Sequence, residues 1–215
     1  MTRWPAKEAM QERILDTADR LFYRQGIRAV GVDTIAAEIG ISKRTLYNYF
    51  PSKDALICAY LSRRSLPLEA SDRPPVEQIL GWFDRIECWA ASGEFRGCPF
   101  VNAVAELGGS SRDATRIAID FKEQRRQWLR DALTRLHVAD PDGLATQLAI
   151  LVDGAVATAL VRGDPAMVGA AKAAARVLLN AAGVNTSGDV GLKRGPTRRT
   201  ARRKAVRART RRNAR

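Results

Sequence analysis

Apolar residues recur along most of the chain at the three- and four-residue spacing of amphipathic helices. Between residues 7 and 25, for example, Ile14, Leu21 and Phe22 share one stripe while charged residues take the other side, and Gly26 ends the pattern. No two-residue alternation typical of a half-buried strand is convincing anywhere in the sequence. The pattern therefore predicts an all-α protein.

Shorter helical segments follow the first one. Two short helices, residues 32–39 and 43–49, are predicted on either side of a tight turn at Gly40, and Ser42 is suited to cap the second of them. After Pro51 interrupts the chain, a fourth helix is expected to run to about residue 64.

The remaining helices are longer and more apolar, and are expected at about 79–90, 100–107, 113–137, 142–162 and 165–182. The first of the last pair has little polar face, and the second is built largely from alanine. Because a helix that is apolar nearly all round must be covered on several sides, and small residues let helix axes approach closely, we expect this hairpin to pack on a second subunit. The residues expected in that interface are Leu148, Val152, Ala155, Val156, Ala159, Ala170, Ala174, Val177 and Leu178.

The distribution of charge distinguishes only the carboxyl end of the chain from the rest. The formal net charge is +13, but residues 193–215 contain 12 Lys and Arg and no acid, and subtracting these leaves +1 for the other 192 residues. With few large apolar residues after Gly183, residues 184–215 are predicted to form a disordered, arginine-rich tail.

Residue types needed for other classes of protein are scarce. Three cysteines without a C-x-x-C pair and a single histidine predict neither a disulfide framework nor a metal site. The amino terminus lacks the features of a secretion signal, and no stretch is expected to be apolar for long enough to span a bilayer. We therefore expect a cytoplasmic protein without membrane association, metal or cofactor. No nucleophile elbow, phosphate loop or paired metal ligands indicates an enzyme.

The two short helices and their turn have the arrangement of a helix-turn-helix, at about residues 31–50, whose second helix enters the DNA major groove by its amino-terminal end. Polar side chains suited to bases and phosphates gather on that helix, whereas Leu46 and Phe50 are placed to anchor it. Lys53, at the start of the next helix, is suited to bind a phosphate. The alternative is that these are the polar faces of ordinary surface helices.

The sequence from Ala36 to Leu56 decides between a DNA-binding helix-turn-helix and ordinary surface helices. It reads A-x-x-x-G-I-S-x-x-T-L-Y-x-Y-F-x-S-K-x-x-L, follows Ile14-Leu15-x-x-Ala18 and Phe22-x-x-x-Gly26, and resembles the DNA-binding domain of the TetR family of transcriptional regulators over roughly residues 8–68. The resemblance places the family's DNA-contacting positions at Lys43, Arg44, Thr45, Tyr47, Asn48, Tyr49 and Lys53.

The same resemblance implies an all-helical homodimer. It implies a DNA-binding domain of three helices, a connecting fourth helix, and a carboxy-terminal domain, residues 69–183, that binds a small ligand and dimerises through its last two long helices. The implied function is that of a ligand-responsive regulator, a repressor, which binds a palindromic operator in double-stranded DNA.

Two residues depart from the family's pattern. Gly31 stands where a threonine usually caps the second helix, so one phosphate contact is expected to be lost, although glycine is a tolerable cap. Asp33 stands where many members carry a basic or polar residue that reaches DNA. Its carboxylate would either repel phosphates or accept a hydrogen bond from cytosine, and the sequence leaves both open.

Aromatic residues at helical spacing either build a core or line a pocket, and in this family the pocket is a gap in the core. Asn102 and Glu106 share a helical face that either selects a polar or cationic ligand group or hydrogen-bonds a neighbouring helix. Cys98 precedes a short helix and is either a redox-sensing or a packed, pocket-lining thiol. The full set of pocket candidates is Trp82, Ile86, Trp89, Cys98, Phe100, Asn102, Glu106, Phe121 and Trp128.

A second function also fits the composition. A nucleic-acid-coating protein acting through the basic tail, with the helical body serving as a dimerisation module, would bind DNA without sequence preference. Sequence specificity of binding distinguishes it from a regulator.

Overall fold

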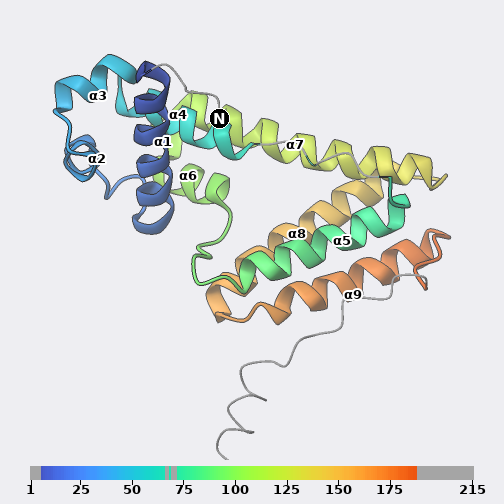
Figure 1. Ribbon diagram of the computed structural model, residues 1–215. Coiled ribbons are helices and arrows are strands. Elements are labelled where there is room, and N and C mark those ends of the chain that lie inside the picture. Colours follow the sequence, from blue (N-terminus) through green and yellow to red (C-terminus); the bar gives the residue numbers. More distant parts are fainter. Residues whose placement is uncertain (1–5, 66–67, 69–71, 188–215) are drawn as a thin grey trace, which may run out of the picture.

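The computed structural model describes residues 6–65, 68 and 72–187, and these form nine α-helices and one short 3₁₀ helix without any strand (Figure 1). The all-α prediction is confirmed. The predicted tail lies almost wholly outside the described residues, which end at residue 187. The α-helices are α1 (Ala6–Gln25), α2 (Val32–Ile39), α3 (Lys43–Tyr49), α4 (Lys53–Arg64), α5 (Pro75–Ala90), α6 (Pro99–Leu107), α7 (Arg112–Arg135), α8 (Pro141–Arg162) and α9 (Ala166–Ala181).

Local signals set the ends of the short helices. Gly40 ends α2 in the left-handed conformation, with φ of 79°, which glycine adopts at little cost. The Ser42 side chain accepts a hydrogen bond from the backbone N–H of Thr45 and caps α3. Ser52 caps α4 in the same way through the N–H of Ala55. These caps fix the turn and the direction of α3.

An amino-terminal hydrophobic core joins α1 to α4. Ile14, Ile35, Leu46 and Leu56, one from each helix, are fully buried in it. Phe100 and Ala103 of α6 and two alanines at the start of α7 belong to the same core. The first four helices are therefore seated on α6 and α7, as Figure 1 shows, and the core crosses the domain boundary expected at residue 68.

A second core joins α5, α8, α9 and the later turns of α7. By length and composition, α8 alone among the described helices could cross a membrane, so the expectation that no segment is apolar for long enough fails on that criterion. The fold uses α8 differently, because it packs against α5, α7 and α9. Leu148 and Ala159, at two levels of the helix, are buried among them.

The α8 residues that were expected in the subunit interface face the core of their own subunit instead. Leu148, Val152, Ala155, Val156 and Ala159 are all 6% exposed or less within their own subunit. A second subunit has no access to them, so this part of the prediction is wrong. The helix is apolar nearly all round, and its buried residues, Leu148 and Ala159 among them, turn inward while Ile150 and Val161 stay exposed.

On α9 the expected interface residues divide differently. Ala170 and Ala174 are exposed and Val177 is 67% exposed, whereas Leu178 packs partly against the core. The outer side of α8 carries Gly154, Ala157, Thr158 and Val161, the last 85% exposed. Small and apolar residues therefore line the outer surface of both helices.

Candidate nucleic-acid interface and ligand cavity

Helix α3 has one buried side and one polar side. Leu46 is fully buried, while Arg44 and Asn48 are exposed and Tyr47 is 38% exposed. Thr45 is half-buried, and its hydroxyl lies 2.8 Å from the capping Ser42 hydroxyl. Arg44, Tyr47 and Asn48 are thus free to meet a partner from solution, and Thr45 also shapes the start of the helix.

The charge on Lys43 is shared with Asp33 of α2. The Lys43 ammonium donates a hydrogen bond to the Asp33 carboxylate over 2.9 Å, and both side chains are exposed. This hydrogen bond and the negative charge raise the pKa of Lys43. The sequence left open what Asp33 would do, and it did not indicate this ion pair, which joins the two helices of the motif.

Lys53 and Tyr49 are less exposed than the side chains around them. Lys53 follows the Ser52 cap at the start of α4, and burial lowers its pKa against the opposing effect of the Glu106 charge. Tyr49 packs partly against the amino-terminal core. Tyr49 is the last residue of α3 and Lys53 is the first residue of α4, so both lie within a few residues of the exposed polar side of α3 in the chain.

A cavity of about 870 Å³ lies between the end of α4 and helices α5 to α8. Phe100 and Phe121 stack on its wall with ring centroids 3.8 Å apart. Of the nine expected pocket residues, those on the wall are Trp82, Ile86, Trp89, Cys98, Phe100 and Phe121. The aromatic spacing therefore identified much of this gap in the core.

The other three expected residues lie outside the cavity wall. The Asn102 amide donates to the backbone carbonyl of Arg96 over 2.8 Å. The Glu106 carboxylate accepts from the backbone N–H of Arg28 over 2.9 Å, so it ties α6 to the turn after α1. Trp128 packs edge-on against Trp82, with ring centroids 5.7 Å apart. For Asn102 and Glu106 the structure has the second of the two expected roles, hydrogen bonds to neighbouring segments.

Two residues expected in the subunit interface, Val152 and Val156, line the cavity instead. Nothing in the sequence indicated the charged residues on this wall, since charges on a helix usually face water. They are Arg64, Lys122, Glu123, Arg125, Arg126 and Asp153.

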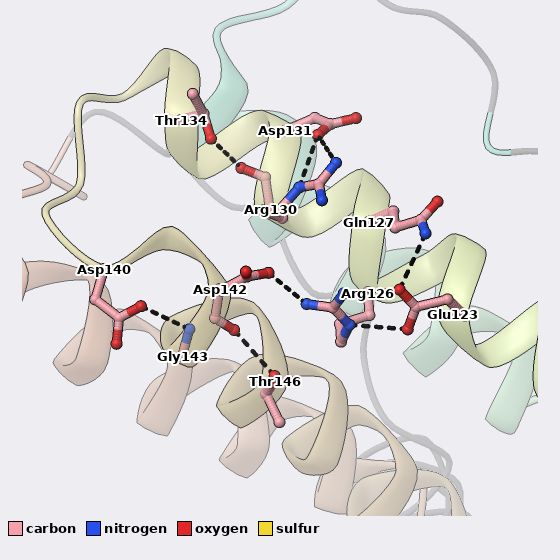
Figure 2. Close-up of polar contacts among 10 residues, drawn as sticks. All are labelled: Glu123, Arg126, Gln127, Arg130, Asp131, Thr134, Asp140, Asp142, Gly143 and Thr146. Carbon is pink, nitrogen blue, oxygen red and sulfur yellow. Dashed lines mark hydrogen bonds and ion pairs between the residues drawn. The ribbon is translucent and has the colours of Figure 1, made fainter.

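Ion pairs join α7 to α8 beside the cavity, and Figure 2 shows the contacts of Arg126. Arg126 donates to Glu123 on its own helix and to Asp142 at the start of α8. The hydrogen bonds that Glu123 accepts from Arg126 and Gln127 lower the pKa of Glu123 to about 2. Lys122 similarly pairs with Asp153 of α8. This wall therefore has its charges matched by neighbours.

The loop before α6 connects α1 to the cavity. The buried Tyr23 hydroxyl donates to the carbonyl of Gly97 over 3.0 Å and accepts from the N–H of Arg96 over 2.9 Å. Gly97 has φ of 78° and lies so close to Leu160 of α8 that a Cβ there would stand 2.8 Å from the leucine side chain. Any other residue would have to adopt this left-handed conformation and displace the Leu160 side chain, so the position favours glycine.

Within the part of the chain that the structure describes, no cluster of three or more His, Cys, Asp or Glu side chains is placed to hold a metal ion.

Comparison with known proteins points in the same direction as the geometry. Residues 14–60 match the model of the bacterial regulatory proteins of the tetR family. The solved structure of the transcriptional regulator sav143 of Streptomyces avermitilis is 35% identical, covers 81% of this chain and 98% of that chain, and superposes with a TM-score of 0.73. The regulator SCO4454 of Streptomyces coelicolor is 27% identical, covers 81% and 96%, and has a TM-score of 0.74.

A curated relative aligns over a shorter span. The HTH-type transcriptional repressor SCO4008 of Streptomyces coelicolor is 35% identical over 79 residues, which are 37% of this chain and 41% of that protein. The first curated relatives are thus matched over less than half of their length.

Proposed function

Since the chain belongs to the TetR family of bacterial transcriptional regulators, we propose that it is a cytoplasmic repressor that binds a palindromic operator as a homodimer. In this proposal it leaves the operator when a small molecule occupies the cavity between α5, α6, α7 and α8. The name of SCO4008 as a repressor supports the sign of regulation. Matched relatives are named as transcriptional regulators, and we propose no catalytic role.

The observation that carries the proposal is the exposed side of α3. Arg44 has the fork of donors that recognises guanine, Asn48 offers a donor and an acceptor to adenine, and Tyr47 reaches phosphate or base edges. Because Leu46 fixes the opposite side in the core, these residues point away from the body of the protein. A rigid, capped helix of this kind is suited to the major groove.

Dimer formation is supported by the outer surface of α8 and α9. Gly154 and Thr158 on α8, and Ala170, Ala174 and Val177 on α9, leave a surface of small side chains and exposed methyl groups. Two such hairpins can approach closely and bury this apolar surface as a four-helix arrangement. Each copy then contributes one α3, and a palindromic site demands two of them about 34–36 Å apart.

Ligand response is supported by the size and lining of the cavity. Its volume of about 870 Å³ lies within the range of roughly 300–1,000 Å³ typical of small-molecule sites. The cavity borders α6 and α7, on which the first four helices are seated. A ligand that favours one arrangement of these helices shifts the spacing of the two α3 helices, by at most its difference in affinity for the two states.

Selection from random duplex DNA tests the proposal. Purified full-length protein is expected to enrich one palindromic sequence, and the enriched duplex should bind far more tightly than a shuffled one. Arg44→Ala should lose this preference, whereas Arg135→Ala, which removes an exposed arginine at the end of α7, should keep it. Failure to enrich any sequence would leave the nucleic-acid-coating function as the better account.

A further inference from the structure

Arg64 stands where the amino-terminal helices meet the cavity. It is the last residue of α4, and among the described residues it is the one side chain of α1 to α4 on the cavity wall. Its Nε and Nη2 donate to the two oxygens of Asp19 on α1, over 2.6 and 2.8 Å. Its guanidinium lies over the Tyr23 ring, 4.3 Å from the centroid. One residue therefore connects α1, α4 and the cavity.

The guanidinium retains donors that Asp19 does not use. An arginine has five N–H groups, and the Asp19 pair occupies one on Nε and one on Nη2. No other hydrogen bond joins Arg64 to a residue that the structure describes. The side chain is 26% exposed and borders the cavity.

Cationic side chains outnumber carboxylates on the cavity wall itself, although Asp19 and Asp142, which do not line the wall, pair with Arg64 and Arg126. Four cationic side chains, Arg64, Lys122, Arg125 and Arg126, face two carboxylates, Glu123 and Asp153. Both carboxylates are already paired with Lys122 and Arg126. Burial and the nearby charge of Arg85 lower the pKa of Arg125, whose guanidinium lies 4.7 Å from the Phe121 ring centroid. The donors of Arg64 that Asp19 leaves unused therefore favour an anionic ligand group over a cationic one.

The rest of the wall determines which kind of ligand body fits the cavity. Trp82, Ile86, Trp89, Phe100 and Val156 present apolar surface, which favours an aliphatic or aromatic body. An anionic group at one end of such a body is drawn to a guanidinium in surroundings that screen charge weakly.

We propose that the effector is a hydrophobic anion whose charged group binds the free edge of Arg64 and weakens the pair between Arg64 and Asp19. This inference rests on the proposed function, since it names the ligand class and the release step of the same cavity. The anion draws the guanidinium toward the cavity, so the two hydrogen bonds to Asp19 lengthen. Helix α1 then keeps the ion pairs of Arg63 with Asp16 and Glu12 but loses the Arg64 pair at the last turn of α4, and the orientation of α3 relative to the body changes.

Octanoate and octan-1-ol are suitable probes, because they share a chain and differ in the charge of the head group. The quenching of tryptophan fluorescence in full-length protein reports their binding, since Trp82 and Trp89 line the cavity. Octanoate is expected to bind roughly tenfold or more tightly than octan-1-ol, the gain of one charge-assisted hydrogen bond. Arg64→Gln should abolish that preference. Equal affinity of the two probes for the wild-type protein overturns the proposal.

Two further variants separate the role of Arg64 from a general effect of charge. Lys122→Gln removes another cation of the wall, and octanoate should still bind better than octan-1-ol. Asp19→Asn leaves Arg64 in place and removes its competitor, so octanoate should bind several-fold more tightly than to the wild type. Weaker octanoate binding to Asp19→Asn, in a variant with wild-type helical content, contradicts competition between the two carboxylates.

The operator assay keeps this inference distinct from the proposed function. If the wild-type protein binds its selected operator but does not prefer octanoate, the proposed function holds and the ligand class proposed here is wrong. If the protein prefers octanoate but selects no operator, the proposed function is wrong, and the preference for a hydrophobic anion remains a property of the cavity. Both measurements use the full chain, and neither requires the natural ligand.

Discussion

Helices α3 and α8 each carry a surface that we propose meets a partner outside the chain, but they are built in opposite ways. Helix α3 has 7 residues, one fully buried anchor at Leu46 and an otherwise polar surface. Helix α8 has 22 residues and is apolar nearly all round. In α3 the single anchor fixes which side faces out. In α8, packing against the neighbouring helices determines which side faces out. Small residues such as Gly154 and Thr158 are left on that outer side.

This difference predicts different consequences for a charge placed on the two sides of the hairpin. Ala155→Glu should destabilise the fold by about 3 to 5 kcal/mol, because Ala155 is 5% exposed and the carboxylate would be buried without a partner. Val177→Glu should leave each subunit folded and separate the dimer, because Val177 is 67% exposed in one subunit. Thermal unfolding and sedimentation measure both effects.

Ala139→Glu, at an exposed position between α7 and α8, is the matched control and should change neither quantity. A Val177→Glu protein that remains dimeric at nanomolar concentration would show that the outer surface of α8 and α9 is not the interface.

The double variant Arg44→Ala, Asn48→Ala should weaken operator binding by about a hundredfold, as each base contact contributes about 1 to 3 kcal/mol. Its oligomeric state and helical content should be those of the wild type, because both side chains are exposed. Fluorescence anisotropy and circular dichroism give the two readouts. Thr45→Ala is a less specific test, since the Thr45 hydroxyl lies within hydrogen-bonding distance of the cap residue Ser42.

Removal of residues 193–215 should weaken non-specific binding about tenfold and flatten its salt dependence, since each phosphate contact contributes about 0.9 to the slope. This prediction comes from the 12 cations of that segment, which lies outside the described residues. The ranking of operator variants should stay the same, because phosphate contacts carry no sequence information. A truncated protein without operator preference would favour the nucleic-acid-coating function.

The smallest expected effect concerns Asp33. Asp33→Asn should strengthen binding to any duplex two- to fivefold, because an exposed ion pair such as that with Lys43 is worth about 1 kcal/mol or less. Anisotropy titrations with operator and shuffled duplexes measure this, and Glu38→Gln on the same helix is the control. Selective loss of operator binding would instead mean that the Asp33 carboxylate accepts a hydrogen bond from a base.

The boundaries of the short helices were predictable because their signals are local, whereas α5 begins at Pro75, before the expected residue 79. The glycine at the end of α2 and the serines that cap α3 and α4 act within a few residues of themselves. The motif of α2 and α3 was predictable for the same reason, since its anchor and its polar side lie within one short segment. The set of cavity aromatics was partly predictable from helical spacing.

Directions between helices were not predictable, because they depend on packing of segments far apart in the chain. Spacing placed Asn102 and Glu106 on one face, but only the fold shows that this face meets the loop before α6 and the turn after α1. Val152 was expected at an interface and lines the cavity, since nothing local separates the sides of α8. The role of Arg64 was not predictable either, because its partner, Asp19, is 45 residues away.

The most direct test of the central claim is a hydroxyl-radical footprint on the selected operator. A homodimer with one α3 per subunit should protect two patches about ten base pairs apart, one on each half-site. The Arg44→Ala, Asn48→Ala protein should protect neither patch at the same concentration. Uniform protection along the duplex, unchanged by these substitutions, would contradict recognition by α3.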